Sequence, residues 1–300
     1  MDFGGEQVNK RIGYVLGTMS LGLALLLAGC GANADTNKQD AASSANQPAA
    51  STPAASGENT TPATTEPQEK VELIVSAAAS LTDAMKEIQT NFEQANPNIS
   101  LSFNFGASGA LQQQIEQGAP ADLFVSASAK NMKALVDENL IASSDQKNLL
   151  QNSLVAIVPV DGTSTVTSEK DLTNKAIKTV AIGIPESVPA GTYAKEALTN
   201  AKLWDQLEKK FVQGKDVRQV LQYVETGNAD AGFVYKTDAL TSKQVKIAFE
   251  VDKSSYTPAN YPLGIIEGTK HRSEAEQFYA YLQTPEVLDI FAKYGFSIPK

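Results

Sequence analysis

Hydroxyl-bearing and small residues gather at four points where a β-rich run gives way to a helical pattern. In open α/β sheets, ligands bind at the carboxyl ends of strands, where the first N–H groups of the following helix have no partner in that helix. Each junction alone is consistent with ordinary helix capping, but four together predict a pocket lined by hydrogen-bond donors, which suits an oxyanion. The four junctions are residues 76–83, 105–111, 185–194 and 214–218.

Two serines and one helix start stand out within these junctions. Ser80 precedes Asp83 by three residues, which is the spacing of a capping box, and Ser108 occupies an expected N-cap position. In the third junction a helix is expected to begin with the N–H groups of Ala190 and Gly191 exposed. Hydroxyl and N–H groups of this kind would bind an anion without a paired cation.

Alternating strand and helix patterns from residue 71 onward must position these junctions. Runs rich in β-branched and aromatic residues predict strands, and apolar residues at helical spacing predict the helices between them. About 230 residues of this alternation predict an α/β protein with two mostly parallel sheets flanked by helices. The expected strands are 71–75, 99–105, 122–125, 154–158, 180–182, 231–235, 245–249 and 263–266.

Composition excludes several classes of function. The 300 residues are 42% apolar and carry a formal net charge of −9, with no basic run after Arg11, so nucleic-acid binding is not expected. One Cys and one His cannot form an internal disulfide or a Cys/His metal cage. Ser144 and Lys147 form a Ser-x-x-Lys pattern that would suit a serine enzyme, but residues 236–238 match its Lys-Thr-Gly companion only in part and the Ser-Asp-Asn element is missing. We therefore expect neither catalysis nor a bound metal cofactor.

The N-terminal part has the pattern of an export signal followed by a tether. Lys10 and Arg11 precede an uncharged apolar run, which ends in Leu-Ala-Gly-Cys at Cys30 and resembles a bacterial lipobox. An uncleaved membrane anchor is the alternative. Residues 31–70 contain no Val, Ile, Leu, Met or aromatic residue and cannot form a core. We expect a signal peptide at 1–29, lipidation of Cys30, a disordered tether to residue 70, and a protein held on the outer face of the cell membrane.

Several motifs together resemble the molybdate-binding lipoproteins and periplasmic proteins of ABC importers. The resemblance extends over the whole expected body, from about Val71 to Lys300. Its motifs are AASLTDA at 78–84, GAPADLFVSA at 118–127, VPAGTYAKEAL at 188–198, DVR at 216–218, GFVYKTDA at 232–239 and KYGF at 293–296.

The resemblance implies a two-lobed fold of the periplasmic-binding-protein type II. Residues 71–152 would form one lobe, to which 250–300 return, and residues 153–249 the other. The chain would cross between them near 153–155 and 248–250. An anion bound between the lobes would hold them together and signal loading to a membrane permease.

The family's ligand residues correspond to five positions of this sequence: Ser80, Ser108, Ala190, Val217 and Tyr235. The implied ligand is molybdate, with tungstate as a second, and the implied partner is the permease of an ABC importer. A monomer is expected. For Tyr235, a buried strand aromatic is the simpler interpretation. Another oxyanion such as sulfate or phosphate, or a small organic solute, remains the alternative ligand.

Overall fold

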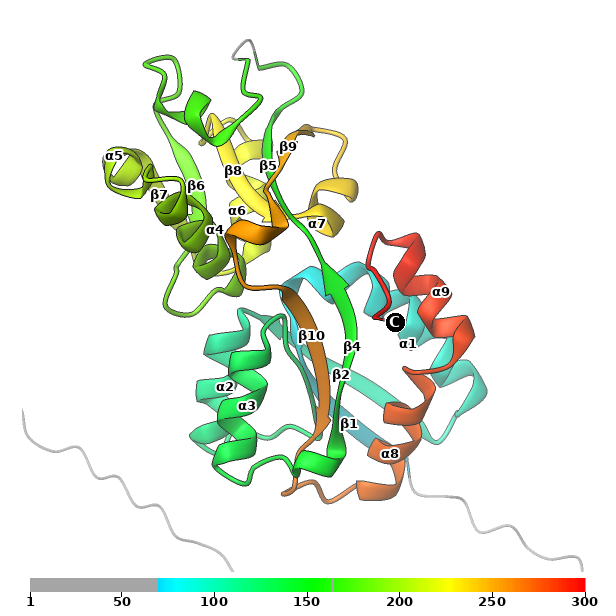
Figure 1. The fold of residues 1–300 in the computed structure, drawn as a ribbon. Helices are drawn as coiled ribbons and strands as arrows, with labels where there is room; N and C mark the ends of the chain where they lie inside the picture. The colour runs from blue at the N-terminus through cyan, green and yellow to red at the C-terminus, as the bar shows by residue number, and fades with distance from the viewer. Residues whose placement is uncertain (1–69, 163–164, 300) are drawn as a thin grey trace, which may run out of the picture. The chain divides into compact units, whose positions relative to one another are not determined.

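The computed structural model describes residues 70–162 and 165–299, which form two β-sheets with their covering helices (Figure 1). The expected signal peptide, Cys30 and the tether through residue 69 lie outside the described residues. In the part of the chain that the structure describes, none of the helices is both long and apolar enough to span a bilayer.

The first five-stranded sheet is mixed and has the strand order β2-β1-β3-β10-β4. β1 pairs in parallel with β2 and β3, whereas β10 is antiparallel to β3 and β4, so four of the five strands point the same way. We call this sheet and its helices lobe 1. Its strands are β1 (Val71–Ala78), β2 (Ile99–Gly106), β3 (Leu123–Val125), β4 (Gln146–Asn152) and β10 (Ala259–Ile265).

The second sheet repeats this arrangement with the strand order β7-β6-β8-β5-β9. β6 is parallel to β7 and β8, and β5 is antiparallel to β8 and β9. We call this sheet and its helices lobe 2. Its strands are β5 (Leu154–Pro159), β6 (Val180–Gly183), β7 (Phe211–Gly214), β8 (Ala231–Tyr235) and β9 (Val245–Glu250).

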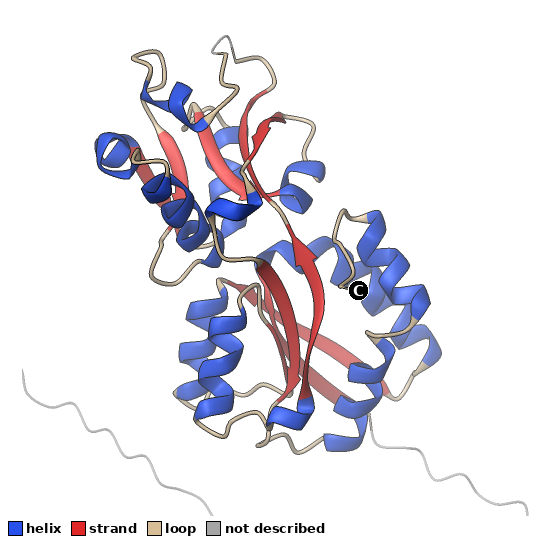
Figure 2. Ribbon diagram, in the orientation of Figure 1, coloured by secondary structure: helices blue, strands red, loops and turns tan. Residues whose placement is uncertain are grey.

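Helices cover both faces of the lobe 1 sheet (Figure 2). α2 and α3 lie on one face and bury a small apolar cluster around Phe124 and Met132. α1, α8 and α9 lie on the other, where Phe92 packs edge-on against Phe278. The helices are α1 (Thr82–Ala95), which follows the 3-10 turn η1 (Ala79–Leu81), α2 (Ser108–Glu116), α3 (Ala129–Asp137), α8 (Arg272–Tyr281) and α9 (Pro285–Lys293).

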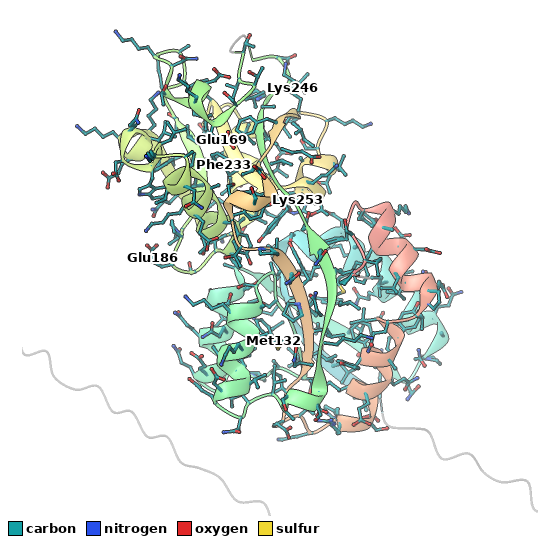
Figure 3. All side chains as sticks on the ribbon, in the orientation of Figure 1. Met132, Glu169, Glu186, Phe233, Lys246 and Lys253 are labelled. Atoms are coloured by element: carbon teal, nitrogen blue, oxygen red, sulfur yellow. The ribbon has the colours of Figure 1, made fainter. Side chains whose placement is uncertain are left out.

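In lobe 2, α4 and α6 both pack on β6 and β8, and α7 packs on β5, β8 and β9. Phe233 of β8, labelled in Figure 3, is fully buried in this core. Burial of the apolar face of each helix supplies the main stabilising term. The helices are α4 (Pro189–Asn200), α5 (Trp204–Leu207), α6 (Val217–Glu225) and α7 (Lys236–Leu240).

The two-lobed α/β fold is confirmed, and the structure adds details that the pattern did not predict. The chain passes between the sheets at Ser153, as expected, but its return lies at residues 251–258 rather than near 248–250, because β9 continues to Glu250. Strands β4 and β7 were not expected. β4 is mostly polar (QKNLLQN) and β7 has only four residues, so neither carries a clear strand pattern.

Candidate functional site

The side chain of Ser80 does not cap a helix, so the predicted capping box is wrong. Ser80 is buried in η1, and the N-cap of α1 is Leu81, with no side-chain cap. Its Oγ lies 2.8 Å from Oη of Tyr261 on β10. A tertiary partner 181 residues away therefore replaces the expected local hydrogen bond.

Ser108 is the first residue of α2 rather than its N-cap, which is Ala107. Its buried Oγ accepts a hydrogen bond of 2.8 Å from the backbone N–H of Ala127, in the loop after β3. The expected cap is therefore wrong, but the hydroxyl is held in a fixed place. Because its oxygen is the acceptor in this bond, its proton remains free to be donated.

Ala190 is the second residue of α4 and is fully buried. Pro189 begins the helix, as is common at a first helical position, and the N–H of Ala190 lies in the turn that has no intrahelical acceptor. The start of α4 packs so closely on β6 that only glycine fits at position 191. A Cβ on Gly191 would lie 2.0 Å from the carbonyl oxygen of Gly183. Glycine at 191 therefore allows β6 to hold the helix start in place.

Val217 is the first residue of α6, as the fourth junction predicted. Asp216 caps this helix, with Oδ1 accepting from the N–H of Gln219 at 2.8 Å. The capping carboxylate satisfies the N–H at the third helical position, and the N–H of Val217 belongs to the same first turn. Val217 is itself buried.

Tyr235 is the last residue of β8 and is buried among aromatic rings. Tyr261 and Tyr193 pack edge-on against it, with ring centroids 5.7 and 6.5 Å away. Its Oη is buried and, among the described residues, has no hydrogen-bond partner. A buried hydroxyl without a partner costs about 1–3 kcal/mol, so this group indicates a place where a bound molecule supplies the acceptor.

Contacts between the lobes bring the junctions together. The N–H of Gly109 in α2 donates to the carbonyl of Ser187, just before α4, at 3.0 Å. Oη of Tyr193 in α4 donates to the carbonyl of Ala127 at 3.2 Å. On lobe 1, Ser80 touches Tyr261, whose ring packs against Tyr235 of lobe 2. Ser187 lies in the loop between β6 and α4, which also contains Glu186, labelled in Figure 3.

The hydroxyl of Ser80 belongs to a hydrogen-bond network that can leave it free to donate a hydrogen bond to a ligand. Asn152 accepts from the N–H of Ser153 through Oδ1, which directs its Nδ2 to Oη of Tyr261, 3.3 Å away. Either hydroxyl of the Ser80–Tyr261 pair can be the donor, and when Tyr261 donates to Oγ of Ser80, the proton of Ser80 is available to a ligand. The site therefore combines the free hydroxyl protons of Ser108 and Tyr235 with the hydroxyl that Ser80 shares with Tyr261 and with the N–H groups at two helix starts.

Burial keeps the tyrosine hydroxyls of this region protonated. It raises the pKa of Tyr193 to about 12, and it raises the pKa of Tyr235 and Tyr261 well above 10. These groups therefore remain hydrogen-bond donors throughout the physiological pH range.

A partly buried ion network, which the sequence motifs did not predict, adjoins this site. Arg218 forms ion pairs of 2.7 Å with Asp83 and with Asp238. Asp238 is fully buried; desolvation raises its pKa to about 6, and the nearby Arg218 only partly offsets this. For Arg218, burial lowers the pKa but the two carboxylates raise it by more. Arg218 is therefore matched by carboxylates, which leaves the positive ends of α4 and α6 as the groups that could attract an anion.

Wild type and Asp238→Asn should differ in how their free energies of unfolding depend on pH. The pKa of Asp238 is about 6 in the folded protein, against an ordinary 3.8, so the folded state binds this proton more tightly. The contribution of Asp238 to stability is therefore full below about pH 4 and is lost as the pH rises through about 6. Urea unfolding at about pH 4.5 and pH 7 should show wild type losing more stability than the variant at the higher pH. Equal losses would contradict the raised pKa.

The Ser-x-x-Lys pattern does not form a catalytic pair in the structure. Oγ of Ser144 donates to Asp145 at 3.0 Å, and Nζ of Lys147 donates to Oε1 of Gln283 at 3.1 Å. Both side chains therefore have other partners.

Comparison with known proteins defines the class. A family model described as bacterial extracellular solute-binding protein matches residues 73–297. YvgL of Bacillus subtilis, provisionally named as an ABC transporter substrate-binding lipoprotein, is 53% identical over 233 residues, covering 78% of this chain and 89% of YvgL. The molybdate-binding protein ModA of Escherichia coli is 40% identical over 230 residues, covering 75% of this chain and 89% of ModA.

A solved structure agrees with these relatives. A substrate-binding domain from Clostridium difficile, assigned provisionally to a molybdenum ABC transporter, is 44% identical, with a TM-score of 0.61, and covers 77% of this chain and all of that domain. The chain belongs to the bacterial extracellular solute-binding protein family. It is a substrate-binding protein of the ABC transporter type, a class that binds solutes and is not enzymatic.

Proposed function

We propose that this protein captures molybdate, and also tungstate, between its two lobes and delivers it to the permease of an ABC importer. The observation that carries the proposal is the buried hydroxyl of Tyr235, which has no partner among the residues that the structure describes and whose ring packs against Tyr261, the partner of Ser80. Names of relatives at 40% and 44% identity support the same ligand class.

The chemistry of the donors favours a fully deprotonated oxyanion. Molybdate and tungstate only accept hydrogen bonds near neutral pH, so hydroxyls and N–H groups can satisfy all of their oxygens. Hydrogen phosphate carries a proton that needs an acceptor, and leaving it unmatched costs about 1–3 kcal/mol. Sulfate has no such proton and must be excluded by its smaller size, so sulfate is the alternative ligand to be tested.

We infer that the five ligand groups are the hydroxyls of Ser80, Ser108 and Tyr235 and the N–H groups of Ala190 and Val217. The two serines would act from lobe 1 and the other three groups from lobe 2. Because the groups come from both lobes, binding would favour the arrangement in which the lobes meet. The free energy gained would equal the difference in the anion's binding free energy between that arrangement and the separated one.

We further propose how the whole chain is organised. Residues 1–29 would be the signal peptide, Cys30 the lipidated residue and 30–70 the tether. Residues 71–152 with 250–300 would form one lobe and 153–249 the other; the division of the strands between the two sheets supports this, apart from Glu250, the last residue of β9. The protein would act as a monomer on the outer face of the membrane, and the provisional lipoprotein name of YvgL supports the anchor.

Calorimetric titration with molybdate, tungstate, sulfate and phosphate tests the proposed ligand. We expect saturable one-to-one binding of molybdate and tungstate and no heat from the other two anions. Binding of sulfate that competes with molybdate would favour the alternative, and absence of molybdate binding would refute the proposal.

The variants Ser80→Ala and Ser108→Ala should each weaken molybdate binding while the protein still folds. Each removes a hydrogen bond to a charged ligand, worth about 1.5–3 kcal/mol, so the Kd should rise roughly 10- to 100-fold. Ser108→Ala should also lower stability, because the N–H of Ala127 loses its acceptor. Ser144→Ala, on an exposed serine, is the matched control. Wild-type affinity in both site variants would refute the site assignment.

A further inference from the structure

Arg218 contacts carboxylates from both lobes. Its Nη2 lies 2.7 Å from Oδ2 of Asp83, at the start of α1 in lobe 1. Its Nε lies 2.7 Å from Oδ1 of Asp238, on α7 in lobe 2. Within residues 70–162 and 165–299, the pair with Asp83 is the one ion pair that joins the two lobes.

The two carboxylates differ in their surroundings. The side chain of Asp238 is 0% exposed, and its Oδ2 accepts from the N–H of Tyr235 at 3.3 Å, so Asp238 holds Arg218 within lobe 2. The side chain of Asp83 is 38% exposed and that of Arg218 is 26% exposed. Water can therefore solvate the Asp83 pair when it separates, whereas breaking the Asp238 pair would leave a buried charge. Separation of the lobes should break the first pair and keep the second.

The ion pair also lies beside the groups that would bind the anion. Arg218 follows Val217 in the first turn of α6, and α6 packs against η1, which contains Ser80. Asp238 is bonded to the backbone of Tyr235. The Arg218–Asp83 pair therefore forms when Ser80 of lobe 1 comes close to Val217 and Tyr235 of lobe 2.

We propose that the Arg218–Asp83 ion pair is a latch between the lobes that slows release of the bound anion. Arg218 is a positioning residue in this role, because it acts on the ligand through α6 and α1 rather than by contact. The identity of the ligand rests on the proposed function, whereas the latch itself rests on the contacts above.

The test compares release of radiolabelled molybdate from wild type, Asp83→Asn and Asp145→Asn, each chased with unlabelled molybdate. Asp145 pairs with Arg272 inside lobe 1, with side chains 21% and 39% exposed, so it is a matched pair that does not join the lobes. Partly exposed pairs contribute modestly, so we expect roughly two- to fivefold faster release from Asp83→Asn, an association rate close to that of wild type, and wild-type release from Asp145→Asn. Asp83→Glu, which keeps the charge, should restore slow release.

Equal release rates in wild type and Asp83→Asn would overturn the latch and leave the proposed function standing. If Asp145→Asn also releases molybdate faster than wild type, the faster release of Asp83→Asn comes from the loss of a negative charge in general. That result would also overturn the latch. If wild type retains no molybdate, the proposed function fails instead. Small-angle scattering of the ligand-free proteins then tests the latch: we expect a larger radius of gyration for Asp83→Asn than for the other two, and equal radii would overturn it.

Discussion

Replacing Gly191 with alanine should lower the melting temperature by about 10 °C and abolish molybdate binding. The added Cβ would lie 2.0 Å from the carbonyl oxygen and 2.5 Å from the carbonyl carbon of Gly183, and both are backbone atoms. Relief requires α4 to move away from β6, at the upper end of the roughly 1–3 kcal/mol that overpacking costs. In a domain of this size each kcal/mol changes the melting temperature by about 2–4 °C. The same movement would displace the N–H of Ala190.

Thermal unfolding and calorimetry of Gly191→Ala, with Gly268→Ala as the control, check this expectation. A Cβ on Gly268 would meet no atom within 4 Å, so that variant should match wild type in both measurements. Wild-type stability and affinity in Gly191→Ala would contradict the contact between α4 and β6, and with it the placement of the helix start in the site.

Tyr235→Phe should change binding and stability in different directions. The hydroxyl of Tyr235 is buried without a partner among the described residues, so its removal should leave the ligand-free protein as stable as wild type or more stable. In the complex, the hydroxyl would donate to a charged oxygen, an interaction worth about 1.5–3 kcal/mol, so the Kd for molybdate should rise roughly 10- to 100-fold. Urea unfolding without ligand and calorimetry with ligand measure the two effects.

The control is Tyr281→Phe, because Tyr281 lies on α8 in lobe 1, with its ring against Phe92. It should bind molybdate as wild type does. A Tyr235→Phe variant that loses stability and keeps its affinity would show that the hydroxyl has a structural role, and would remove Tyr235 from the proposed ligand set.

Local patterns predicted the elements that carry the site, but not the contacts that its side chains make. Helix starts near Ala190 and Val217 could be predicted because Pro189 and Asp216 are strong local signals for a first turn. The capping box of Ser80 failed because Tyr261, distant in sequence, forms the hydrogen bond instead. Tertiary contacts of this kind leave no mark on residue spacing.

The ion network illustrates the same limit. Arg218 lies inside the DVR motif at 216–218, yet its partners come from α1 and α7, and only the packing of the lobes brings them to it. Tyr235 could be placed at a strand end from sequence, but the sequence alone favoured a plain buried aromatic. The missing partner of its hydroxyl became visible only once the surrounding rings were placed.

The most direct test of the account is a crystal structure of the protein grown with molybdate, with the anion located by the anomalous scattering of molybdenum. We predict one strong peak between the lobes, with the anion's oxygens within hydrogen-bond distance of the hydroxyls of Ser80, Ser108 and Tyr235 and of the N–H groups of Ala190 and Val217. A peak elsewhere, or a fully loaded crystal in which Tyr235 has no ligand contact, would contradict the central claim.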